Sequence, residues 1–61
     1  MKRAELIRRI EAADCVHIRH GGKHDWYQNP KTKVCQPVPR HTEIKEYLAK
    51  SILCKLQADR D

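Results

Sequence analysis

The first segment of the chain alternates apolar and charged residues at the spacing of an amphipathic helix. Between Lys2 and Ala13 the charged side chains fall mostly on one side. The apolar positions share the other side: Leu6, Ile7, Ile10 and Ala13. Because apolar side chains three and four residues apart lie on one helical face, the pattern predicts a helix over Lys2–Ala13 that stops at Asp14.

The middle of the chain changes to the shorter period of extended strands. Two turn-forming stretches, HGGK at residues 20–23 and NPKTK at residues 29–33, divide it into apolar, partly β-branched or aromatic pieces. The pattern predicts three strands over residues 15–19, 24–29 and 34–38. Pro37 cannot donate a ladder hydrogen bond, which favours an edge or a strand end for the third strand.

A second helical pattern follows the strands. Thr42 is a residue type that caps helices, and Glu43 and Glu46 would complement the dipole in the first turn. The expected inner stripe is Ile44, Tyr47, Leu48, Ser51, Ile52 and Leu56. The predicted order is therefore helix, three strands, helix. This is an α+β fold in which two helices cover one face of a three-stranded antiparallel sheet. The other sheet face, or the loop edge beside it, is left for a partner.

Length and charge narrow the classes of function. A chain of 61 residues is expected to form a single domain over residues 1–61 with a small core, too small to enclose a large cofactor. Any active site should be shallow and near the surface. The net charge of +5, from 13 Lys and Arg against 8 Asp and Glu, favours a polyanionic partner such as nucleic acid or an acidic protein.

The cysteines and the apolar runs indicate a cytoplasmic protein. Cys15, Cys35 and Cys54 are odd in number and form no Cys-x-x-Cys pair, so they are interpreted as reduced packing residues at the core or its rim. No apolar run approaches the roughly 20 residues of a membrane span. The N-terminal stretch lacks the uninterrupted apolar region of a signal peptide.

His24 is the sharpest candidate for catalysis. Histidine can take up and return a proton near neutral pH. His24 follows the glycine pair Gly21 and Gly22, whose backbone N–H groups can form an anion-binding nest, and Lys23 and Arg19 add positive charge. A phosphate held there would bring a ribose hydroxyl to the imidazole. This is the arrangement that RNA cleavage requires, and it needs no metal ion because the nucleophile belongs to the substrate. The structural alternative is a histidine at a strand end that packs on Trp26.

Other residues could contact RNA around this position. Lys31, Lys33 and Arg40 could follow a phosphate backbone together, although each is an ordinary solvated charge by itself. Strand alternation points Tyr27 away from Trp26, so Tyr27 could meet RNA or donate a hydrogen bond near the site. Trp26 and Tyr47 are assigned mainly to the core, because the chain contains no phenylalanine.

A metal centre fits the residue spacing poorly. The histidines and cysteines are ligand types that zinc prefers, but they form no two-pair pattern. The spacing of His20 and His24 would suit a helix, yet a glycine pair lies between them. We therefore expect no metal site.

Four segments of the chain resemble the HicA toxin family. They are MKRAELIRRIEAADC at residues 1–15, RHGGKHDWYQNP at residues 19–30, VPRH at residues 38–41 and EIKEYLAKSILCKL at residues 43–56, in the family's order. The resemblance implies a fold like a double-stranded RNA-binding domain with the order α-β-β-β-α. It implies an mRNA interferase that a HicB-type antitoxin blocks by binding over the active site. The family's catalytic histidine opens the second strand, so the resemblance assigns this role to His24, preceded by Lys23 where a serine or another small or polar residue is usual.

The favoured hypothesis is thus a toxin endoribonuclease that uses neither a metal nor any other cofactor. His24 would act as general base or acid, and Arg19, Gly21, Gly22 and Lys23 would form the phosphate cradle. A second proton-transfer group is unassigned, with Tyr27 or solvent as candidates. Two alternatives are a non-catalytic RNA-binding module of the same fold and a protein-interaction domain whose basic face binds an acidic partner.

Overall fold

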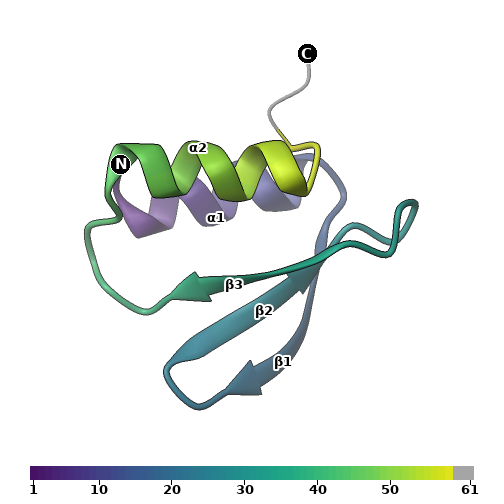
Figure 1. Cartoon of the computed structure of the whole chain (residues 1–61), viewed down its shortest axis with the longest axis horizontal. Coiled ribbons are helices and arrows are strands. Elements are labelled where there is room, and N and C mark those ends of the chain that lie inside the picture. Colours follow the sequence, from purple (N-terminus) through teal and green to yellow (C-terminus); the bar gives the residue numbers. More distant parts are fainter. Residues whose placement is uncertain (59–61) are drawn as a thin grey trace.

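Two helices flank three strands along the chain in the computed structural model, which describes residues 1–58. Figure 1 shows the order α1 (Arg3–Ala12), β1 (Val16–Gly21), β2 (His24–Gln28), β3 (Cys35–Pro39) and α2 (Glu46–Lys55). The predicted α-β-β-β-α order and the α+β class are confirmed. The prediction of one domain over residues 1–61 extends beyond the described residues and stays a prediction.

The helix α1 ends where the sequence predicts. Its C-cap is Ala13, and Asp14 follows with a φ of 66°. A left-handed residue cannot continue a right-handed helix, so the chain turns there toward β1.

The three strands form one antiparallel sheet in the order β1-β2-β3. This places β3 at an edge, as Pro37 predicts. Between β1 and β2 the register shifts, because His17 pairs with Tyr27 and Arg19 pairs with Trp26. The bulge at Ile18 therefore puts Arg19 on the same face as Trp26, and His20 on the same face as Asp25.

Both helices lie on one face of the sheet, with β3 nearest to them in Figure 1. The core between the two layers takes Tyr27 and Val38 from the sheet. The remaining buried apolar residues come mostly from the helices: Leu6, Ile10, Cys15, Ile44, Ala49, Ile52, Leu53 and Leu56. No described element covers the opposite face, where Val16 and Ile18 are 46% and 42% exposed. We call this second face the open face.

The start of α2 differs from the prediction. Thr42 does not cap the helix, and Glu43 does not lie in its first turn, since α2 begins at Glu46. Residues 42–44 instead pair with the beginning of the chain: the Arg3 amide donates to the Thr42 carbonyl at 2.9 Å, and the Ile44 amide donates to the Met1 carbonyl at 2.8 Å. This long-range backbone pairing keeps the segment extended, and local residue preference cannot reveal it.

The buried stripe of α2 also differs. Tyr47 is 72% exposed, so its assignment to the core is wrong, and Ser51 is only half-buried. Ile44, Ile52 and Leu56 are buried as predicted, and Ala49 and Leu53 are the core residues of α2 that the prediction left out. Among the described residues, no helix is long and apolar enough to cross a membrane.

Candidate functional site

The turn between β1 and β2 depends on Gly22. Its φ of 49° lies in the left-handed region, where a residue with a Cβ atom is strained. Gly21 is the last residue of β1 and pairs with His24, the first residue of β2. The two-residue turn Gly22–Lys23 therefore leads directly into His24.

His24 is exposed at the start of β2. It pairs with Gly21 on one side and with Pro39 on the other, which places it on the open face of the sheet. A ring in this position is accessible to a large substrate, as proton transfer to RNA requires.

An open hollow lies between the turn and the segment after β3, and its lining includes Lys23, the residue before His24. Its lining residues are Gly22, Lys23, Arg40 and His41, and its volume is about 350 Å³. Because Pro39 pairs with His24, Arg40 and His41 follow immediately on that side. We call this the turn hollow. It combines two cationic side chains, an imidazole and a glycine turn, which together suit a phosphate group.

Arg40 is held at this hollow by a nearly buried carboxylate. Asp25, 8% exposed, accepts hydrogen bonds on Oδ1 from Arg40 Nη2 at 2.9 Å and from Arg40 Nε at 3.2 Å. Arg3 of α1 donates to Asp25 Oδ2 at 2.6 Å. The Arg40 guanidinium is the main cause that holds the pKa of Asp25 well below its usual range; His20 acts in the same direction, and burial opposes them.

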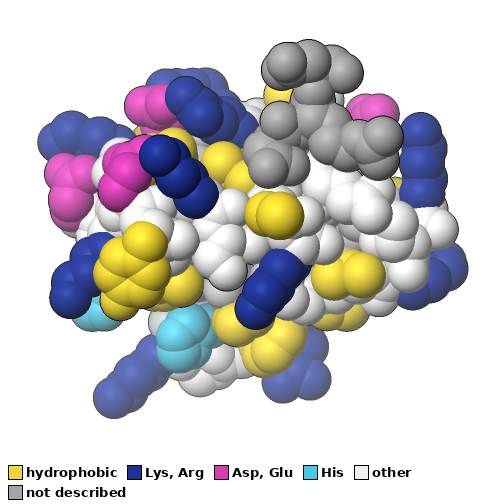
Figure 2. Space-filling model, turned by 45° about the horizontal axis from the view of Figure 1, so that its top comes forward, with side chains coloured by type: hydrophobic (Ala, Val, Ile, Leu, Met, Phe, Trp, Pro, Cys, Tyr) yellow, Lys and Arg dark blue, Asp and Glu magenta, His cyan; other side chains and the backbone are white. Residues whose placement is uncertain are grey.

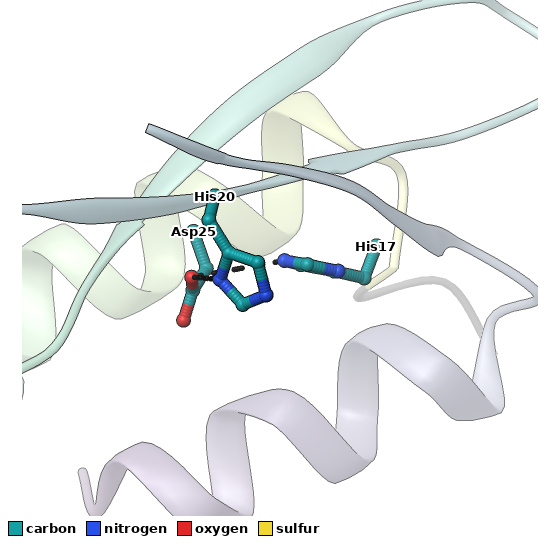
Figure 3. A group of neighbouring side chains, drawn as sticks. All are labelled: His17, His20 and Asp25. Atoms are coloured by element: carbon teal, nitrogen blue, oxygen red, sulfur yellow. Dashed lines mark hydrogen bonds and ion pairs between the residues drawn. The ribbon is translucent and has the colours of Figure 1, made fainter. Parts of the chain in front are cut away.

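Two histidines of β1 complete this group, which we call the Asp25 cluster: Arg3, His17, His20, Asp25 and Arg40. In Figure 3 both imidazoles point toward the carboxylate. His20 Nδ1 lies 2.8 Å from Asp25 Oδ1, and His17 Nε2 lies 3.7 Å from the same oxygen. Sequence reasoning missed the cluster. Strand alternation and the β1 bulge bring its members together, and the bulge leaves no clear signal in the sequence.

The cluster has the donor atoms of a metal site but the contacts of an ion-pair network. The ligand atoms of His17, His20 and Asp25 lie within 4.8 Å of one another. However, Asp25 already binds Arg3 and Arg40, and these two guanidinium groups oppose a cation at the carboxylate. His20 and His24 point to opposite faces of the sheet, so this pair does not converge.

The two aromatic residues of β2 have exchanged the expected positions. Tyr27 is 7% exposed and packs in the core, where its ring and that of His17 form an edge contact with 5.3 Å between centroids. Its assignment to the RNA surface is therefore wrong, and burial raises the pKa of its hydroxyl. Trp26 lies on the open face beside Arg19. Alternation predicts that the two point in opposite directions, but it does not say which one faces the helices.

The lack of a side chain at Gly21 is required by the position of Trp26 rather than by the turn. A Cβ atom on Gly21 would lie 2.8 Å from Trp26 Nε1, so only glycine lets the indole lie this close to β1. Arg19 places its guanidinium 5.7 Å from the center of the Trp26 ring. The phosphate contacts of Arg19 and Gly21 stay a prediction.

Lys31 and Lys33 do not approach the turn hollow. Both are exposed in the turn between β2 and β3, at the end of β2 opposite to His24. At about 3.3 Å per residue, the length of β2 keeps them roughly 16 Å away. Figure 2 shows Lys and Arg side chains around much of the visible outline, while most of the acidic ones gather at its left end. Lys31 and Lys33 could contact only a distant part of a long RNA.

No disulfide joins the cysteines, all three of which lie in the described part of the chain. Cys15 packs in the core, and burial raises the pKa of its thiol. Cys35 is half-buried. Cys54 is exposed on α2, so its assignment as a packing residue is wrong.

Comparison with known proteins gives a family match. A family model described as HicA toxin of bacterial toxin–antitoxin systems matches residues 3–58. No curated protein and no solved structure matches the chain.

Proposed function

The chain belongs to the HicA toxin family of bacterial toxin–antitoxin systems, and from this premise we propose that it is an endoribonuclease that cleaves mRNA without a metal ion. The catalytic residue in this proposal is His24. The observation that supports it best is the exposed imidazole at the start of β2, next to the glycine turn and the cationic turn hollow.

The proposed reaction uses a nucleophile from the substrate. His24 takes the proton of a ribose 2′-hydroxyl, and the 2′-oxygen forms a bond to the neighbouring phosphorus. The bond from phosphorus to the 5′-oxygen breaks, and that oxygen takes up a proton. The products are a 2′,3′-cyclic phosphate and a 5′-hydroxyl end. DNA lacks the 2′-hydroxyl, so the activity should be restricted to RNA.

Positive charge at the turn hollow would stabilise the phosphorane. Lys23 of the turn supplies the cation next to His24. Arg40, whose orientation is set by Asp25, contacts Asp25 and His20 on the helix-facing side of the sheet and would bind an adjoining phosphate of the RNA. Since Arg40 binds Asp25 through Nε and Nη2, its Nη1 is the group expected to bind a phosphate oxygen. A hydrogen-bond donor whose orientation is fixed before RNA binds loses little conformational entropy in the reaction.

His41 is the better candidate for the second proton transfer. Tyr27, considered from the sequence, lies in the core on the other face of the sheet from His24. His41 lines the turn hollow, two residues after the strand position that pairs with His24. This position supports His41 as the group that protonates the leaving 5′-oxygen.

A toxin of this family has an antitoxin partner. We propose that the partner is a HicB-type protein that covers the open face around His24 and so blocks access of RNA. We further propose that the protein acts in the cytoplasm, where its mRNA substrate is.

The test compares His24→Gln with His41→Gln in RNA cleavage assays that contain EDTA. Glutamine retains hydrogen bonding and removes proton transfer. We expect His24→Gln to lower the cleavage rate by about 10²- to 10⁴-fold, the usual contribution of general acid–base catalysis. His41→Gln should lower it by a similar factor if His41 protonates the leaving group. Circular dichroism should show that both variants fold.

Several results would contradict the proposal. Unchanged cleavage by His24→Gln would remove His24 from the mechanism. Loss of wild-type activity in EDTA with recovery in Mg²⁺ would show that a metal is required. A wild-type protein that shifts RNA on a gel but leaves it intact would favour the non-catalytic RNA-binding module, and tight binding to an acidic protein without RNA affinity would favour an interaction domain.

A further inference from the structure

The open face contains a second hollow that the proposed chemistry does not use. Ile18, Arg19, Trp26 and Cys35 line it, and its volume is about 360 Å³. We call it the sheet hollow. It is separate from the turn hollow, since the two share no lining residue. Its walls are mainly apolar, with one aromatic ring and one cation.

Trp26 is held in a defined orientation in the sheet hollow. On one side, Gly21 allows the indole to approach β1 closely, because a Cβ atom would lie 2.8 Å from Trp26 Nε1. The Arg19 guanidinium lies 5.7 Å from the ring center, within the range of a cation–π contact. On the other side, Pro37 of β3 pairs with Trp26. The indole remains only partly buried, although it is the largest apolar side chain of the sheet.

His24 and Trp26 are neighbours on the same face of β2. Alternate residues of a strand point to one face and are about 7 Å apart. A ligand bound on Trp26 therefore lies next to any group whose proton His24 transfers. One nucleotide can bridge this separation.

We propose that the sheet hollow binds an unpaired base of the RNA next to the bond that His24 cleaves, with the base stacked on Trp26 and close to Arg19. This inference rests on the proposed function. Stacking on an aromatic ring accepts every base, because each base has a π face, and it needs single-stranded RNA. The Arg19 cation and the neighbouring Lys23 complement the negative charge of the nucleotide.

The first experiment uses the fluorescence of Trp26, the only tryptophan in the chain. The unaltered protein is titrated with a short single-stranded deoxyoligonucleotide, which it should not cleave because the 2′-hydroxyl is absent. The matched probe is an abasic chain with the same number of phosphates. We expect the oligonucleotide with bases to quench the emission and the abasic chain to bind more weakly and quench much less. Equal quenching by both would overturn the proposal.

The second experiment changes the ring. Trp26→Leu removes the aromatic face, and we expect it to weaken oligonucleotide binding by about tenfold or more, the lower range for loss of one stacked base. Trp26→Phe should retain most of the affinity. The control is Val16→Ala, on the same face but outside the sheet hollow, which should leave the affinity unchanged.

Binding of the antitoxin is measured with the same variants. If Trp26→Leu weakens antitoxin binding and leaves oligonucleotide binding unchanged, the sheet hollow is a protein interface. That result would overturn the proposal. The two proposals fail separately. Base-dependent quenching by a protein that never cleaves RNA would reject the nuclease and keep the base site, whereas RNA cleavage without base-dependent quenching would reject only the base site.

Discussion

At the scale of single residues, Gly21 and Gly22 are neighbours that meet different physical requirements. Gly22 has a positive φ, and no atom beyond its two neighbours in the chain lies within 4 Å of the position of an added Cβ. Gly21 has no positive φ, but its added Cβ would contact the Trp26 indole. The first glycine therefore permits a side-chain contact on the open face, and the second permits the turn.

We expect Gly22→Ala to lower the free energy of unfolding by about 1 kcal/mol or somewhat more, the usual cost of a left-handed conformation for a residue with a Cβ atom. Urea unfolding measures this. The folded emission spectrum of Trp26 should stay unchanged, because Gly22 does not contact the ring. In Gly21→Ala the emission maximum should shift, since the indole must move. A shift of the emission maximum in Gly22→Ala would contradict the separate roles of the two glycines.

At the scale of elements, contacts with residues far away in the sequence decide where helix α2 begins and which of its faces is buried. Residues 42–44 pair with the beginning of the chain, so the helix begins at Glu46 without a side-chain cap hydrogen bond from Lys45. The core then takes the stripe of Ala49, Ile52, Leu53 and Leu56, and Tyr47 remains in solvent.

Leu53→Ala and Tyr47→Ala test which face of α2 is buried. Leu53 is 2% exposed, and its truncation should lower the free energy of unfolding by about 2 to 5 kcal/mol, through lost burial and a cavity. Tyr47→Ala should change it by less than about 0.5 kcal/mol. Denaturant unfolding of both variants makes the comparison. Similar destabilisation by the two substitutions would show that Tyr47 packs in the core after all.

At the scale of the whole molecule, the Asp25 cluster joins segments that are far apart in the sequence. Asp25 of β2 binds Arg3 of α1, His20 of β1 and Arg40 after β3. One carboxylate thus ties the helix layer to the sheet and orients a cation at the turn hollow. Stability and the proposed catalysis therefore depend on the same group.

We expect Asp25→Asn to lower stability at neutral pH and to lower RNA cleavage, because Arg40 loses its anchor. The pKa of Asp25 is depressed in the folded state, so its stabilisation is fully present above the usual value near 3.8 and is lost as the pH falls through the lower folded value. The part of the stability difference between the wild type and Asp25→Asn that comes from this carboxylate should therefore shrink as the pH falls below about 4. Thermal or urea unfolding across this range measures it, and a difference that grows on acidification would contradict the assignment.

Much of the fold can be predicted from the sequence. The element order is predicted by the hydrophobic periods of 3.6 and 2 residues, the glycine pair and the NPKTK stretch. The resemblance of the sequence to the HicA toxin family agrees with the family match over residues 3–58. Element boundaries were less accurate, as Thr42 and Glu43 show, because long-range backbone pairing decides where α2 begins. The exposed position of His24 follows from its place after the turn.

The sequence by itself determined the α-β-β-β-α order, the excess of positive charge and the family. It also determined that a histidine follows a glycine turn, as the proposed chemistry requires. Tertiary structure alone decided that Tyr27 rather than Trp26 enters the core, and that His17, His20 and Asp25 meet two arginines. The physical reason is that periodicity is a local property of the chain. The choice of buried face depends on contacts with distant elements, and a single bulge in β1 changes which side chains share a face.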